Sequence, residues 1–168
     1  MSEHIPFNDR PAASMAPGPG RWIDPRGQRF GAGLSAAVLV AALAFDLVWL
    51  VALVMLALAI SSAFGTRWFI FGRPWPFLRR VLPLAPTKPE HEYPPRFAQA
   101  LGSIFLAVGL VSLVAGIEPW GWLPVVGVIA LQLLLAVTGY CLGCRLYGLR
   151  WIGPALFLRL VGRPFAAR

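Results

Sequence analysis

Two cysteines near the end of the chain are the residues whose types and spacing could do chemistry. Cys141 and Cys144 are the only cysteines and form a Cys-x-x-Cys motif, followed directly by Arg145. On a helix, residues three apart share a face and their Cα atoms lie roughly 5–6 Å apart, within disulfide range. A neighbouring guanidinium favours the thiolate, the nucleophile of thiol–disulfide exchange. The motif therefore predicts a redox pair of Cys141 and Cys144, with Arg145 stabilising the thiolate.

The same pair permits three other interpretations. Cys141 and Cys144 could ligate a metal ion, but structural zinc usually takes four ligands, so further ligands would have to come from a partner or a second copy. A cysteine beside a membrane span can be acylated, and a free cysteine can act as a small apolar residue. We expect the pair at the end of the last long helix, where the dipole disfavours an anion and activation is modest. The spacing alone leaves all four roles open.

No other group of residues predicts catalysis. His91 lies between two glutamates without the spacing of known metal-site motifs, which favours a solvated acidic loop. The sequence has no phosphate-binding glycine loop and no paired carboxylates inside an apolar block. We therefore expect no cofactor, and whether the protein is an enzyme stays open.

Two long apolar blocks, residues 30–66 and 97–144, must position the cysteines. All fifteen Lys and Arg residues lie outside both blocks. Lipid hydrocarbon excludes cations, whereas cytoplasmic loops retain them. Charged residues make up 13% of the chain, against about 25% in soluble domains. We therefore expect an integral membrane protein, whose net charge of +8 serves topology and lipid head groups rather than nucleic acid.

The two blocks divide into four spans of the length that a bilayer requires. Residues 117–122 contain an acid, a proline and two tryptophans, which favour a turn at the membrane surface. Asp46 interrupts the first block. At a turn it would be solvated or would cap the next helix, whereas deep in lipid it would be functional, and the span lengths favour the turn. The predicted transmembrane helices are residues 30–45, 48–64, 97–116 and 123–140.

The distribution of cations predicts the orientation of these spans. The segment before residue 30, the loop 67–96 and the tail from residue 145 hold four, six and five cations, and the two intervening turns hold none. By the positive-inside rule, these three segments lie in the cytoplasm. We therefore expect a multi-pass protein of the inner (plasma) membrane with both termini cytoplasmic.

The two blocks resemble each other, which indicates an internal repeat. Each opens on Arg-Phe followed by small residues, at Arg29 and at Arg96. In the closing segments, Ala63 and Thr66 of the first block align with the two cysteines of the second. The fold position therefore does not need cysteine. The sequence predicts two tandem helical hairpins in one orientation, a parallel repeat related by an axis along the membrane normal.

The predicted fold class is an all-α integral membrane protein with interfacial amphipathic segments. Residues 22–150 form the four-helix membrane domain, with the loop 67–96 at the cytoplasmic surface. Residues 1–21 form a disordered cytoplasmic tail, and residues 151–168 an interfacial tail. Aromatic residues mixed with arginine and proline in the loop suit the lipid head-group layer.

The chain resembles a family of small bacterial membrane proteins known as domain of unknown function family 4395. The resemblance covers about residues 22–150 and implies a four-helix membrane protein without an assigned activity. It rests on three motifs in this order: Asp24-Pro25-Arg26-Gly27-Gln28-Arg29-Phe30, Pro95-Arg96-Phe97-Ala98 and Cys141-Leu142-Gly143-Cys144.

Two classes of function are compatible with these observations. In the first, the protein is a thiol redox or sulfur-relay module that uses Cys141 and Cys144, and a thioredoxin-like or sulfurtransferase protein would suit it as a partner. In the second, it is a membrane scaffold that docks a protein or anionic lipid, and the cysteines are structural. Its spans lack the ionisable residues of a proton-coupled transporter. Besides the lipid bilayer we expect no nucleic-acid partner, and either class allows an oligomer.

Overall fold

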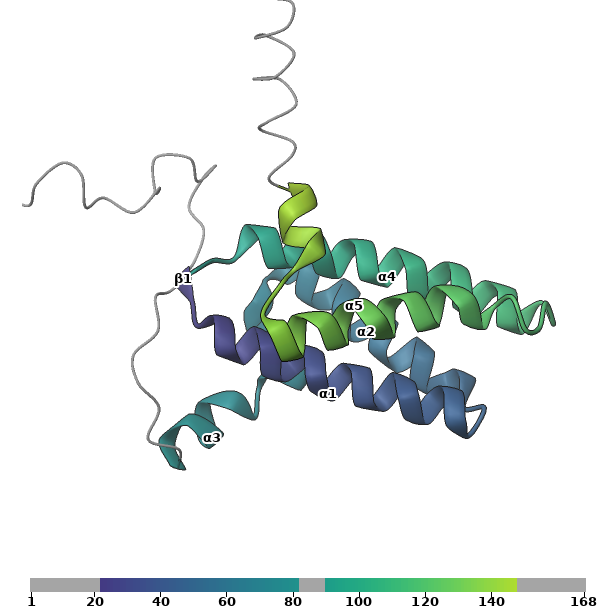
Figure 1. The fold of residues 1–168 in the computed structure, drawn as a ribbon, viewed down its shortest axis with the longest axis horizontal. Helices are drawn as coiled ribbons and strands as arrows, with labels where there is room; N and C mark the ends of the chain where they lie inside the picture. The colour runs from purple at the N-terminus through teal and green to yellow at the C-terminus, as the bar shows by residue number, and fades with distance from the viewer. Residues whose placement is uncertain (1–21, 82–89, 148–168) are drawn as a thin grey trace, which may run out of the picture.

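Four long helices form the bundle that carries the cysteines (Figure 1). The computed structural model describes residues 22–81 and 90–147. The prediction of a helical fold is confirmed, since short strands of two residues are the only other regular structure in these ranges. The predicted tails, 1–21 and 151–168, lie outside the described residues. The four long helices are α1 (Pro25–Ala44), α2 (Val48–Phe64), α4 (Tyr93–Val114) and α5 (Trp122–Thr138).

The outer faces of these helices are apolar. By length and composition α1 and α4 could each cross a membrane, while α2 and α5 are shorter apolar helices. Within the apolar 18-residue stretch of each helix, only 33% of the residues of α1 and 22% of those of α4 are buried inside the bundle. Most of their apolar surface therefore faces outward. Val40, Leu56, Val108 and Val126, one from each helix, are all exposed. Contiguous apolar surface of this kind is rare on soluble monomers and marks contact with lipid or another protein.

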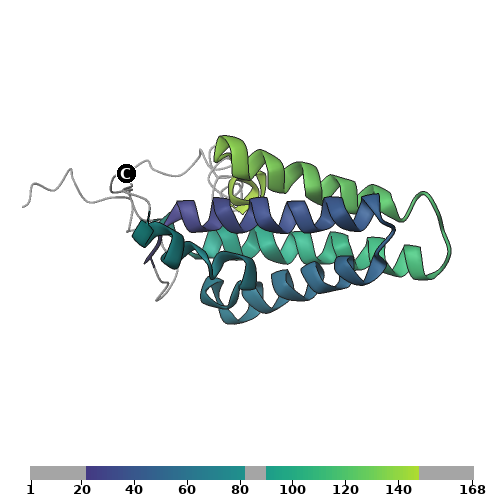
Figure 2. The same cartoon turned by 90° about the horizontal axis from the view of Figure 1, so that it is seen from below.

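Each long helix packs mainly against a helix of the other hairpin. α1 and α2 form one hairpin and α4 and α5 the other, and both connecting turns lie at the same end of the bundle (Figure 1). The most extensive packing joins α2 to α4 and α1 to α5 (Figure 2). Leu39, Val54, Leu106 and Val125, one from each helix, are fully buried. The core therefore lies where the hairpins meet, and neither hairpin encloses it alone.

The helices α1 and α4 begin earlier than the sequence predicted, at Pro25 and Tyr93. Proline is favoured in the first turn of a helix because its missing N–H would have no partner there. The Oδ1 atom of Asp24 caps α1 by accepting a hydrogen bond of 3.0 Å from the backbone N–H two residues later. Arg29 and Arg96 therefore lie inside their helices, one turn from the start, and not in front of them.

Both predicted turns are present, at the end of the bundle away from the cysteines. Asp46 is exposed between α1 and α2, and Glu118 is exposed between α4 and α5. The interpretation of Asp46 as a turn residue is confirmed, and its φ of 53° is a left-handed conformation in which aspartate is enriched. The predicted capping role is wrong, because Leu47 is the N-cap residue of α2 and no side chain caps that helix.

The segment after α2 folds back against α1. It contains η3 (Thr66–Trp68), η4 (Ile70–Gly72) and α3 (Trp75–Val81). Phe69 is 3% exposed, and its ring covers Gly31, where an added Cβ would lie only 2.5 Å from the ring. Part of the predicted surface loop therefore belongs to the core of the protein.

A short pair of strands joins the two segments that precede α1 and α4. β1 (Trp22–Ile23) pairs antiparallel with β2 (Glu90–His91). The His91 ring stacks on Tyr93 with centroids 5.0 Å apart and meets the Trp22 ring edge-on at 5.5 Å. His91 therefore belongs to an aromatic cluster, and the prediction of a solvated loop at this residue is wrong.

Candidate functional site

The last long helix ends before the cysteines, contrary to the sequence-based expectation. α5 closes at Thr138, and Gly139 adopts a left-handed conformation with φ 74° as its C-cap residue. Glycine at this position ends a helix because it has no Cβ to oppose positive φ. Residues 142–147 then form a new helix directly after Cys141. The pair therefore lies at a helix start, where backbone N–H groups are free to donate.

Cys141 and Cys144 are joined by a disulfide, and their Cα atoms are 5.2 Å apart. The predicted proximity of the two residues is therefore present in the structure. Both side chains are half-buried. The backbone N–H of Cys144 donates a hydrogen bond of 3.2 Å to the Sγ atom of Cys141. A donor aimed at sulfur favours the thiolate form of that cysteine.

Arg145 anchors the motif through its backbone. Its N–H donates a hydrogen bond of 3.1 Å to the carbonyl oxygen of Cys141. Its guanidinium lies over the Tyr140 ring, 5.4 Å from the ring centroid. The side chain is thus held over Tyr140, and its role as a thiolate stabiliser stays a prediction.

Gly143 allows the motif to rest on α4. An added Cβ at this position would lie 2.6 Å from the Cβ atom and 2.9 Å from the Cα atom of Ala98. Real Cβ atoms essentially never come within 3.0 Å of other heavy atoms, so any larger residue forces the backbones apart. Tyr147 extends the same contact, with its ring 5.8 Å from that of Phe97. The glycine of Cys-Leu-Gly-Cys therefore fixes the distance between the cysteines and α4.

Arg29 and Arg96 each bind the C-terminal end of a helix in the other hairpin. The Nη2 atom of Arg29 donates to the carbonyl oxygens of Ala136 and Val137, at 3.1 and 2.8 Å, near the end of α5. Near the end of α2, Arg96 donates from its Nε atom to the carbonyl oxygen of Ser62 and from its Nη2 atom to that of Ala63, at 2.9 and 2.7 Å. These carbonyl groups have no partner within their own helix. The repeated Arg-Phe pair was the sequence feature that marked these two arginines, but their capping role was not predicted.

The contacts of these two arginines correct the repeat alignment. Gly65 and Gly139 are the C-cap residues of α2 and α5, both have positive φ, and each follows the carbonyls that an arginine binds. With these glycines matched, Arg67 and Ile70 stand where the second repeat has its cysteines. The earlier alignment with Ala63 and Thr66 is therefore wrong by four residues. Cysteine is still absent from the matching positions.

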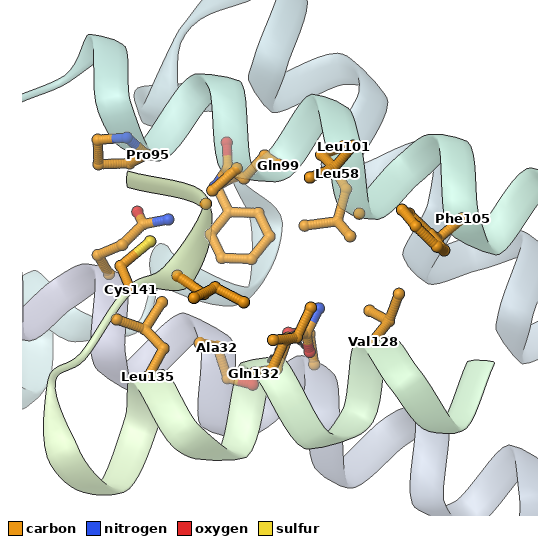
Figure 3. Close-up of a pocket in the computed structure, with 18 of the residues that line it drawn as sticks. Ala32, Leu58, Pro95, Gln99, Leu101, Phe105, Val128, Gln132, Leu135 and Cys141 are labelled. Atoms are coloured by element: carbon orange, nitrogen blue, oxygen red, sulfur yellow. Dashed lines mark hydrogen bonds between the residues drawn. The ribbon is translucent and has the colours of Figure 1, made fainter. Parts of the chain in front are cut away.

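One wall of a cavity inside the bundle is formed by Cys141 (Figure 3). The cavity has a volume of about 100 Å³ and lies between residues of all four long helices. Most of its lining is apolar, and no charged side chain of the described residues contributes to it. Its polar lining consists of one serine, one disulfide cysteine and all three glutamines of the chain. These residues are Ser35, Cys141, Gln28, Gln99 and Gln132.

Serine hydroxyls hold two of the glutamines. The Ser61 hydroxyl donates to the Oε1 atom of Gln99, and the Ser35 hydroxyl donates to the Oε1 atom of Gln132, both at 2.6 Å. Gln99 is 5% exposed, and its Nε2 group has no hydrogen-bond partner among the described residues. A buried donor without a partner costs about 1–3 kcal/mol. The sequence analysis missed both glutamines, although they are the only ones inside the apolar blocks.

Comparison with known proteins places the chain in a family without naming an activity. A family model described as "Domain of unknown function (DUF4395)" matches residues 23–151, which is more than half of the chain. No curated protein matches the sequence, and no solved structure matches the fold. Among the described residues, no group of three or more His, Cys, Asp or Glu residues could hold a metal ion.

Proposed function

The chain belongs to the DUF4395 family, and we propose that it is a membrane-embedded thiol–disulfide exchange module whose exchanging pair is Cys141 and Cys144. One observation carries this proposal: the pair forms a half-buried disulfide at a helix start, with a backbone N–H donating to the Cys141 sulfur. The donor favours release of Cys141 as a thiolate, and a more stable leaving thiolate speeds exchange.

The proposed exchange begins at Cys144. A thiolate of a thioredoxin-like partner attacks the Sγ atom of Cys144, the Cys141–Cys144 bond breaks, and Cys141 leaves as a thiolate. A second partner thiolate then attacks the partner sulfur of the mixed disulfide and releases Cys144. The partner loses two electrons and becomes a disulfide, and the pair gains them and becomes a dithiol. This order is supported by the position of Cys141 against the cavity, on the inner side of the motif.

A redox titration with mass-shift alkylation tests the proposal. The purified full chain in detergent is equilibrated with defined mixtures of reduced and oxidised glutathione, then with dithiothreitol. We expect both thiols to become reactive together in one two-electron transition. Cys141→Ser, mixed with the disulfide form of a thioredoxin-like protein, should be trapped as a mixed disulfide at Cys144 when the Cys144 thiolate attacks that disulfide and displaces a partner thiolate, whereas Cys144→Ser should not. A pair that stays reduced in strongly oxidising buffer, or oxidised in strong reductant, would refute the exchange function.

The membrane arrangement is part of the same proposal: four spans, with the cysteines and both termini on the cytoplasmic side. It is supported by the apolar outer faces and by the described arginines, which all lie at the end where α1 and α4 begin. These are Arg26, Arg29, Arg67, Arg73, Arg79, Arg80, Arg96 and Arg145. Maleimide labelling of Asp46→Cys and of Glu118→Cys, in a background without native cysteines, tests it. Labelling of either position from the cytoplasm alone would overturn it.

A scaffold without thiol chemistry is the second candidate, and one surface feature favours it. Two cations lie near the exposed Trp68 ring: the guanidinium groups of Arg67 and Arg73 are 5.6 and 5.8 Å from its centroid. Such a basic aromatic surface could dock an acidic protein or anionic lipid. A partner that still co-purifies with the Cys141→Ser/Cys144→Ser variant would support this candidate.

A further inference from the structure

We propose that the cavity beside Cys141 binds the ring of a quinone, which takes up the two electrons of the Cys141–Cys144 dithiol. The inference rests on the proposed exchange function, because it names the oxidant that would regenerate the disulfide. Three properties of the cavity carry it: its neutrality, its unpartnered donor and its opening.

The lining of the cavity selects an uncharged ligand. None of the described residues that line it is charged, and most are apolar. A nicotinamide or flavin nucleotide brings phosphates, which require cations or free backbone N–H groups around them. The redox carrier that fits is therefore neutral and largely hydrocarbon, and a quinone is the two-electron carrier with these properties.

Gln99 adds a requirement for a hydrogen-bond acceptor. Ser61 holds its Oε1 atom, so the Nε2 group is the part of the amide that has no partner, in a side chain that is 5% exposed. The Gln132 amide also lines the cavity, and the Ser35 hydroxyl, which lies 2.6 Å from its Oε1 atom, shares its proton with the carbonyl oxygen of Ala32. The two glutamines come from α4 and α5. With one amide side chain from each of two helices at one apolar space, a small rotation of each side chain would let it donate to one of the two carbonyl oxygens of a quinone.

The cavity opens to the outer apolar surface between α4 and α5. Phe105 on α4 and Leu131 on α5 both line it, yet they are 48% and 43% exposed. Leu142 and Leu146 of the helix formed by residues 142–147 line it as well and are similarly exposed. This apolar opening would let an isoprenoid tail extend into lipid while the ring lies inside.

The cavity must widen to admit a substituted ring. Its volume is about 100 Å³, which is less than the roughly 150 Å³ of an engineered cavity that holds benzene in another protein. The exposed leucines at the opening are flexible side chains that can move to admit ring substituents. A fused, multi-ring cofactor would instead require the helices to separate.

The reaction balances without any further reactant. The two thiols lose two electrons and two protons as the Cys141–Cys144 bond forms. The two carbonyl oxygens of the quinone take up both electrons and both protons and become the hydroxyl groups of a hydroquinone. Cys141 faces the ring and Cys144 faces the partner, so one disulfide would serve both reactions in turn.

Duroquinone, tetramethyl-1,4-benzoquinone, is the probe for this inference. Its ring carbons are fully substituted, so it cannot form a stable thioether with the cysteines. In the first arm, equilibrium dialysis measures its binding to the full chain in detergent, relative to empty micelles. This arm uses the Cys141→Ser/Cys144→Ser variant, so that binding is measured independently of thiol chemistry. We expect saturable binding with one quinone per chain.

In the second arm, the pre-reduced wild-type chain is mixed with duroquinone. We expect one hydroquinone per disulfide formed, followed by ultraviolet absorbance and by alkylation. Gln99→Leu should weaken binding and slow quinone reduction about tenfold, the effect of losing one buried hydrogen bond. Gln132→Leu should do the same and serves if Gln99→Leu unfolds. Ser103→Ala, on α4 but outside the cavity lining, should change neither quantity by more than about twofold.

The outcomes separate the two proposals. Saturable binding that both glutamine variants weaken, with stoichiometric hydroquinone from the wild type, supports the inference. A pair that responds to glutathione but neither binds nor reduces duroquinone overturns the quinone site and leaves the exchange function standing. Quinone binding by a pair that never titrates refutes the exchange function and, with it, the role of the quinone as its oxidant. Reduction that Gln99→Leu and Gln132→Leu leave unchanged overturns the cavity as the place of reaction.

Discussion

Gly143→Ala should release the Cys-x-x-Cys segment from α4. The new Cβ would lie 2.6 Å from the Cβ atom and 2.9 Å from the Cα atom of Ala98, and a backbone atom cannot turn aside as a side chain can. The two segments must separate until this contact reaches an ordinary 3.4 Å. Overpacking of this kind costs about 1–3 kcal/mol. Alanine returns up to about 1 kcal/mol in helix propensity, so we expect a net loss of about 1–2 kcal/mol.

Gly127→Ala is the matched control for this variant. Gly127 lies in α5, and an added Cβ there would have nothing within 4 Å. We expect it to stabilise the protein by up to about 1 kcal/mol. Ala98→Gly, combined with Gly143→Ala, removes the shorter of the two close contacts and should restore part of the loss. The three variants therefore isolate the contact between the motif and α4 from the general effect of alanine.

Two measurements read the effect of Gly143→Ala. Hydrogen exchange of residues 142–147 reports the local release of the helix, which we expect to exchange faster than in the wild type by the factor that corresponds to the lost free energy. Detergent-induced unfolding followed by tryptophan fluorescence reports the whole bundle, which should change less. If Gly143→Ala behaves like Gly127→Ala in both measurements, the close approach to α4 does not position the cysteines.

Two further predictions concern the ends of the helices. Arg29→Gln and Arg96→Gln should each lower the free energy of unfolding by about 1–3 kcal/mol, because each leaves carbonyl groups at the end of the opposite hairpin without a donor; equal stability to the wild type would show that water or lipid head groups replace the guanidinium. Asp24→Ala should cost about 1 kcal/mol through loss of the α1 cap. Asp46→Asn keeps a residue type that tolerates the left-handed conformation of this exposed turn, so it should stay within about 0.5 kcal/mol. Thermal unfolding of the two variants compares them, and a larger loss for Asp46→Asn would contradict the turn assignment.

The sequence predicted the helical hairpins because apolar length and the position of charges are both encoded locally. Asp46 and the acid at position 118 mark the two turns without reference to the rest of the fold. The helix starts were predicted too late, because an apolar window does not register a first turn built from proline and a capping carboxylate. Asp24 and Pro25 carried that information in their types, as residues that favour the start of a helix.

The candidate site was only partly predictable. The spacing of Cys141 and Cys144 indicated their proximity, but their place at a helix start depends on the backbone conformation of Gly139, and a glycine permits many conformations. The cavity was not predictable, because Gln99 and Gln132 lie on different helices and meet only through the crosswise packing of the hairpins. Long-range packing of this kind leaves no local periodicity in the sequence.

The contacts of Arg29 and Arg96 with the other hairpin also limit the order in which the helix ends can be capped during synthesis. The ribosome completes α2 before it makes Arg96, so the last carbonyl groups of the first hairpin lack this donor when α2 is first synthesised. Arg29, made early, has its acceptors only when α5 has been synthesised. The first hairpin must therefore persist with an incomplete helix end until the start of α4 has been made. The end of α2 can therefore be capped before α5 is made, whereas the end of α5, which the cysteines follow, is capped last.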